Sequence, residues 1–81
     1  MLKVQDFAEV ADNVSPLGVK VTRWGLREQT PEADVFLTRR ESRGAVEWYG
    51  MVLVDDEGQD AYAGPCDTAA EVLRWLEGVM P

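Results

Sequence analysis

Residues 34–54 carry the clearest structural signal in this 81-residue chain, and they read DVFLTRRESRGAVEWYGMVLV. Two runs rich in β-branched and aromatic residues, 34–41 and 45–54, flank the short connection SRG at 42–44. This pattern is typical of a β-hairpin with a tight turn. The second run is apolar on both sides of the strand, so we expect it at a central position in an antiparallel sheet.

A two-residue turn at Arg43-Gly44 fixes which side chains of the hairpin lie opposite one another. The expected pairs fall on two sides of the sheet: Arg40–Glu47, Thr38–Tyr49 and Phe36–Met51 on one, and Arg39–Trp48 and Val35–Val52 on the other. We expect two of these pairs to be in direct contact. Arg40 and Glu47 should form an ion pair, and the guanidinium of Arg39 should stack on the indole of Trp48. A slip of one residue would exchange the two faces, so the pairing depends on this turn.

Two further strands are expected, one on each side of the hairpin. Alternation of side chains predicts a strand at 19–26, followed by a connection at 29–32. The acidic segment at 55–58 is expected to form a turn, and residues 59–63 return as a short fourth strand. The Gly-Pro step at 64–65 is expected to end that strand.

A short helix is predicted near the N-terminus, over residues 5–13. Its apolar side chains follow helical spacing, at Phe7, Val10, Ala11 and Val14. The helix is expected to end before Pro16, because proline disfavours helical geometry in the residue that precedes it.

A second helix is predicted at the C-terminus. Thr68 and Glu71 have the spacing of a capping box, in which each side chain bonds to the backbone near the other. An apolar stripe follows, made of Val72, Leu73, Leu76 and Val79. We expect this helix to run to about Glu77, with Gly78 as its C-terminal stop.

These elements predict one small acidic α+β domain over residues 1–81. Its expected order is α-β-β-β-β-α, a three- to four-stranded antiparallel sheet with an N-terminal and a C-terminal helix. Two short helices can cover only one face of such a sheet. Part of the second face is therefore expected to be uncovered.

Net charge limits the classes of partner. Fifteen acidic and eight basic residues give −7, which argues against direct binding to nucleic acid or to an anionic membrane. Residues 44–81 contain eight acids against Arg74 alone. Cys66, the single cysteine, has no partner for an internal disulfide, so a reducing, cytoplasmic location is expected.

The sequence lacks the usual residues of a catalytic or metal site. It has no histidine, the commonest general base near neutral pH and the commonest transition-metal ligand. Without an imidazole to activate it, Cys66 is interpreted as an inert, half-buried thiol packed by Pro65. The acids at 55–60 do not match the ligand spacing of a calcium loop, and the glycines stand singly. We therefore expect no enzyme, with no catalytic residue, no metal and no cofactor.

An arginine cluster beside aromatic residues raises the alternative of nucleic-acid binding. Arg39, Arg40 and Arg43 lie near Trp48 and Tyr49, a combination that some sheets use to bind nucleic acid. Acidic residues interleave with the cluster, and the remainder of the chain repels phosphate. Cross-strand ion pairing and stacking account for the same residues, so direct nucleic-acid binding is disfavoured.

The remaining hypothesis is recognition of another macromolecule by surface contact. An acidic hairpin tip and an uncovered sheet face are the candidate contacts, formed by Asp55, Asp56, Glu57 and Asp60 and by Phe36, Tyr49, Met51 and Trp24. Aromatic and methionine side chains supply binding energy at interfaces, while acidic groups attract basic partners. We therefore predict a non-enzymatic binding or inhibitor protein for a basic partner such as a nucleic-acid-binding effector or a nuclease.

In size and net charge the chain is similar to phage anti-CRISPR proteins and to bacterial immunity proteins or antitoxins. This similarity is one of composition and includes no motif. It implies a protein partner with a basic surface. The alternative is a structural or assembly protein that forms a homodimer through the uncovered sheet face.

Overall fold

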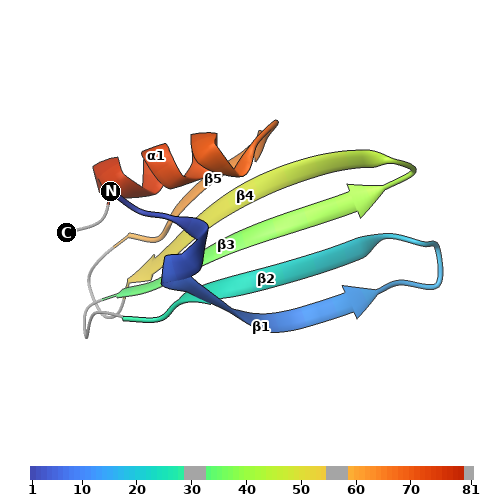
Figure 1. Cartoon of the computed structure of the whole chain (residues 1–81), viewed down its shortest axis with the longest axis horizontal. Coiled ribbons are helices and arrows are strands. Elements are labelled where there is room, and N and C mark those ends of the chain that lie inside the picture. Colours follow the sequence, from blue (N-terminus) through green and yellow to red (C-terminus); the bar gives the residue numbers. More distant parts are fainter. Residues whose placement is uncertain (29–32, 55–58, 80–81) are drawn as a thin grey trace.

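The computed structural model describes residues 1–28, 33–54 and 59–79. The elements in chain order are η1 (Val4–Asp6), β1 (Phe7–Val14), β2 (Lys20–Leu26), β3 (Ala33–Ser42), β4 (Ala45–Val54), β5 (Ala61–Cys66) and α1 (Ala69–Val79). The strands form one antiparallel sheet in the order β1-β2-β3-β4-β5, so strands that follow one another in sequence are neighbours. The helix α1 packs along β4 and β5 on one face of this sheet (Figure 1). The α+β class is thus confirmed. The predicted connection at 29–32 and turn at 55–58 lie outside the described residues.

The central hairpin of β3 and β4 has the predicted register in every pair. Arg43 and Gly44 form the two-residue turn with φ of 53° and 79°, values that match the twist of a hairpin. Arg40 Nη1 lies 2.9 Å from Glu47 Oε1, and the guanidinium carbon of Arg39 lies 5.9 Å from the centre of the Trp48 ring. Both predicted contacts are confirmed.

The predicted N-terminal helix over 5–13 is wrong. Only Val4–Asp6 is helical, as a single 3-10 turn, and the chain continues as the edge strand β1. The register of β1 against β2 shifts between Glu9 and Ala11, as at a β-bulge. One extra residue in a strand changes its period of two into mixed spacings. The helix-like pattern therefore came from a bulged strand, in which Val10 and Val14 are exposed.

The sheet has five strands rather than three or four, and its last strand is longer than predicted. The strand β5 continues through the cis Gly64-Pro65 peptide to Cys66, instead of ending at the Gly-Pro step. An edge strand tolerates proline because one side of its backbone needs no hydrogen-bonded neighbour. Within the described chain, β5 pairs with β4 alone.

Half of the predicted capping box of the C-terminal helix is present, because the Glu71 carboxylate contacts the Thr68 hydroxyl rather than the Thr68 backbone amide. The predicted stop at Gly78 is wrong. The Glu71 amide donates to Thr68 Oγ1 at 3.3 Å, and the Thr68 hydroxyl reaches Glu71 Oε1 at 3.4 Å. The helix continues through Gly78 to Val79. Glycine in a helix costs only about 1 kcal/mol relative to alanine, which is too little to end a helix that its apolar face holds in place.

The core lies between α1 and the sheet face that α1 covers. Val72, Leu73 and Leu76 of the helix pack there with sheet residues, among them Val35, Leu37 and Val52. The close approach of α1 requires Gly50 in β4, because an added Cβ would lie 2.8 Å from Val72 Cγ1 and 3.0 Å from the Trp75 ring. The described segments contain no helix long and apolar enough to cross a membrane.

Candidate binding face

The sheet face opposite α1 carries a group of large side chains. Residues directly opposite in antiparallel strands share a face, so the pairings Gly25–Phe36, Phe36–Met51 and Met51–Tyr62 form one row across the sheet. The pairings Arg23–Thr38 and Thr38–Tyr49 form the next row. Leu37 and Gly50 alternate with these residues and point toward α1. We call the surface the open face, made of Arg23, Phe36, Thr38, Tyr49, Met51 and Tyr62.

The open face is partly accessible even though its side chains shield one another. Tyr62 is 65% exposed, whereas Phe36, Tyr49 and Met51 are half-buried. The other elements that could cover a sheet lie elsewhere: α1 packs on the opposite face, and Leu2 of the N-terminal segment packs with the same core and donates its amide to Glu77. The described part of the chain thus leaves the open face uncovered, as predicted for one face of the sheet.

A hollow of about 330 Å³ lies within the open face. Its lining comes from β2, β3, β4 and β5 and consists of Arg23, Thr38, Tyr49, Gly50, Met51, Tyr62, Ala63 and Gly64. Gly64 leaves room for the Tyr49 ring to lie against β5, because an added Cβ there would lie 2.6 Å from Tyr49 Cδ2. The φ of Gly64 is 119°, a conformation that residues with side chains rarely adopt. The position of the ring therefore depends on the backbone of the neighbouring strand.

Arg23 is the charged group of this hollow. Its Nε donates to Thr38 Oγ1 at 3.3 Å, and its guanidinium carbon lies 5.9 Å from the centre of the Phe36 ring. Arg40 and Glu47 occupy the same face in the next row and bond to each other at 2.9 Å. Over residues 1–28, 33–54 and 59–79, Arg23 makes no salt bridge. The open face thus combines one unneutralised cation with aromatic and apolar area.

The structure brings together three of the residues that the sequence indicated for binding. Phe36, Tyr49 and Met51 share the open face. Trp24 does not join them, since it lies opposite Leu37 on the α1 side of the sheet and stacks on Trp48 with ring centres 5.9 Å apart. Its ring packs against the core.

Of the four acidic candidates the structure describes Asp60, which does not line the hollow. Asp60 is exposed, and its Oδ1 accepts a hydrogen bond of 2.9 Å from the Val54 amide, so it ties the end of β4 to the start of β5. Asp55, Asp56 and Glu57 lie outside the described residues. The predicted acidic tip stays a prediction.

Sequence reasoning missed Arg23 and Tyr62. Both fall in predicted strands, and Arg23 alternates with Trp24 along β2, which places it on the side away from the core. Their neighbours across the sheet depend on how β2 pairs with β3 and how β4 pairs with β5. No two-residue turn fixes those registers in the sequence, as Arg43-Gly44 does for the central hairpin.

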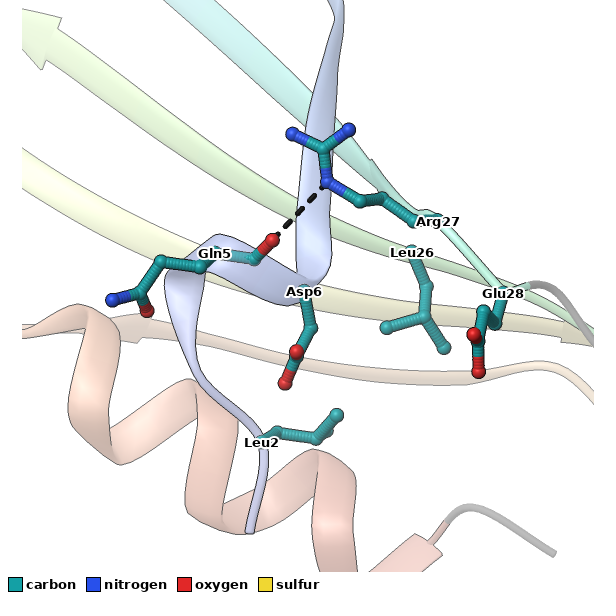
Figure 2. Close-up of a pocket in the computed structure, with 6 residues that line it drawn as sticks. All are labelled: Leu2, Gln5, Asp6, Leu26, Arg27 and Glu28. Carbon is teal, nitrogen blue, oxygen red and sulfur yellow. Dashed lines mark hydrogen bonds between the residues drawn. The ribbon is translucent and has the colours of Figure 1, made fainter.

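A second hollow, of about 400 Å³, lies between η1 and the end of β2 (Figure 2). Leu2 and Leu26 form its apolar part, and the carboxylates of Asp6 and Glu28 point to the same side in this view. The Arg27 guanidinium turns away from them, with Nε donating to the Gln5 carbonyl oxygen at 3.1 Å. The Arg27 amide also donates to the Asp6 carbonyl oxygen. The two hydrogen bonds of Arg27 therefore connect the N-terminal turn to the end of β2.

The described residues show no constellation for metal binding and no orphaned polar group. They contain no cluster of three or more potential His, Cys, Asp or Glu ligands. Every buried side-chain nitrogen or oxygen in these segments has a hydrogen-bond partner. Cys66 is a free, half-buried thiol packed against the core. No protein-family model, curated protein or solved structure matches the chain. Its function must therefore be inferred from the open face itself.

Proposed function

We propose that this chain is a non-enzymatic binding protein that docks through its open face on a basic macromolecular partner, such as a nucleic-acid-binding effector or a nuclease. One observation carries the proposal: Phe36, Tyr49, Met51 and Tyr62 form a contiguous group on a sheet face that the described elements leave uncovered. Aromatic and methionine side chains are enriched at protein interfaces, where partly exposed rings provide contact area at a small entropic cost.

The charge of the chain supports a basic partner. The net charge is −7, and two exposed regions contribute to it with more acidic than basic residues. The strand β1 carries Glu9 and Asp12 and no basic residue, and α1 carries Glu71 and Glu77 against Arg74. Such a field attracts a positively charged protein before contact and accelerates its association at low salt. A reducing, cytoplasmic location accords with the single free Cys66 and belongs to the same proposal.

A homodimer through the open face is the second candidate, and the Arg40–Glu47 pair favours it. This pair borders the open face in the next row of the same sheet face, with both side chains about two-fifths exposed, 43% for Arg40 and 36% for Glu47. In a two-fold symmetric dimer, Arg40 of each copy would be able to bind Glu47 of the other copy in place of its own. Size-exclusion chromatography with light scattering separates the candidates, because a monomer requires a different protein as partner and a stable dimer supports self-association.

Two serine variants test the docking face. Tyr62→Ser removes the most exposed ring of the open face, and Leu17→Ser removes a 92% exposed apolar side chain from the β1–β2 connection as a matched control. We expect the wild-type chain and L17S to retain a basic partner protein on an affinity column, and Y62S to lose most of it. Equal retention by both variants would argue against the open face as the contact surface.

A further inference from the structure

We propose that the hollow around Arg23 binds a carboxylate of the docked protein, either an Asp or Glu side chain or a chain terminus, that is flanked by apolar residues. The inference rests on the proposed function, because it names the group that the open face recognises on its partner. A basic partner can present such a group. Net charge acts over roughly a Debye length of 10 Å, whereas the hollow selects one group in direct contact.

The guanidinium of Arg23 lines the hollow and is anchored at one edge, with donors left for an external acceptor. The bond from Nε to Thr38 Oγ1 and the contact with the Phe36 ring hold one edge of the group. Thr38 is itself buried, so the acceptor of this bond is held by packing. Arginine has five N–H donors in a planar fork, and this bond engages the one on Nε. The terminal nitrogens make no salt bridge within the described chain.

The other charged groups on the same face do not neutralise Arg23. Glu47 is bound to Arg40 at 2.9 Å. Asp34 lies opposite Leu53, in the row beyond Phe36 and Met51. The hollow therefore has one positive charge without a described counterion, which makes an anion the complementary ligand.

The walls of the hollow favour a carboxylate on an apolar stem. Tyr49, Met51 and Tyr62 provide aromatic and thioether surface around the charged group. A hydrogen bond between ions is stronger where such surface excludes water, and the paired oxygens of a carboxylate match the guanidinium fork. The volume of about 330 Å³ lies near the lower limit for small-molecule sites and has room for one acidic side chain with its apolar neighbours.

Nucleic-acid phosphate is the competing anion, and the charges disfavour it. Binding to a nucleic-acid backbone normally requires several cations, since each phosphate contact releases one counterion. Among the described residues of this sheet face, Arg23 is the one cation without a salt bridge, and the chain as a whole carries −7. An oligonucleotide would meet long-range repulsion before it reached this single arginine.

A matched pair of peptides tests the inference on the intact chain by NMR. The probes are the blocked tripeptides acetyl-Leu-Glu-Leu-amide and acetyl-Leu-Gln-Leu-amide, which differ in charge but hardly in shape, and a short oligouridylate. We expect the Glu peptide to shift the Arg23 Nε–H and Met51 methyl signals and to bind about tenfold more tightly than the Gln peptide, the ratio typical of one charge-assisted hydrogen bond.

Variants assign the effect to the guanidinium. Arg23→Gln should abolish the preference for the Glu peptide, and Arg23→Lys should retain part of it, because lysine keeps the charge but lacks the fork. The control Arg74→Gln removes an exposed cation from α1, on the other side of the sheet, and should leave the preference unchanged. A preference that persists in R23Q would overturn the assignment.

The wild-type titrations remain decisive if R23Q does not fold. Equal binding of the two peptides at the open face would overturn the carboxylate inference and leave the proposed docking face standing. If the oligouridylate shifted the same Arg23 and Met51 signals and bound more tightly than the Glu peptide, both the carboxylate inference and the proposal of a protein partner would be overturned. Shifts confined to residues outside the open face would overturn the inference.

Discussion

Replacing Gly50 with alanine tests how α1 is seated on the sheet. The added methyl carbon would lie 2.8 Å from Val72 Cγ1 and 3.0 Å from two ring carbons of Trp75. Carbon atoms in contact normally lie about 3.5–4.0 Å apart, so the helix must retreat by roughly 0.7 Å or the Trp75 ring must leave its position. Such overpacking costs about 1–3 kcal/mol. Alanine recovers about 0.5–1 kcal/mol relative to glycine in a strand, which leaves a net loss of about 1 kcal/mol.

The assay is thermal unfolding followed by circular dichroism and tryptophan fluorescence. For a domain of this size, a loss of about 1 kcal/mol lowers Tm by roughly 4–8 °C. Gly78→Ala is the control, because no atom lies within 4 Å of its added Cβ and the position is helical. That variant should gain up to about 1 kcal/mol. If G50A were as stable as the wild type or more stable, α1 would not lie against β4 at this residue.

Three further predictions follow from the same structure. Thr68→Ala removes the cap of α1 and should cost about 1 kcal/mol in urea unfolding, whereas an unchanged midpoint would contradict the cap. Leu37→Ala empties a fully buried site in β3 and should cost about 2–5 kcal/mol, enough to unfold much of a marginal domain, as the loss of near-ultraviolet circular dichroism would report. A double-mutant cycle on Arg40 and Glu47 should give a coupling below about 1 kcal/mol that declines with salt, because both side chains are partly exposed. A larger coupling that does not change with salt would contradict the prediction of a weak, solvent-screened ion pair.

The central hairpin shows which parts of the fold a sequence can determine. Its turn at Arg43-Gly44 takes positive φ at both positions, and a two-residue turn leaves only one register for the strands on either side. Every pair from Val35–Val52 to Arg40–Glu47 followed from this one local feature. The residues that form the turn also fix the pairing of the two strands, so the local sequence was sufficient to predict the register.

The N-terminal segment shows where such a rule fails. Spacings of three and four residues from Phe7 to Val14 match a helix, but they also match a strand with one extra residue at a bulge. The choice between them depends on pairing with β2, which contributes a ladder of hydrogen bonds that no local pattern reveals. The grouping of Arg23 and Tyr62 with Met51 also depends on the pairing of separate strands, and for that reason the sequence did not predict it.

The alternation of β4 links the stability of the domain to its proposed function. Trp48, Gly50 and Val52 face α1, while Tyr49 and Met51 face the hollow. Successive residues of a strand point to opposite sides of the sheet. A shift of the β4 backbone therefore moves the surface that contacts α1 and the open face together. Gly50 lines both, since its missing side chain admits α1 on one side and its backbone borders the hollow on the other. A substitution at Tyr62 or Arg23 can therefore report on binding alone only where the unfolding midpoint is unchanged, whereas one at Gly50 must alter both.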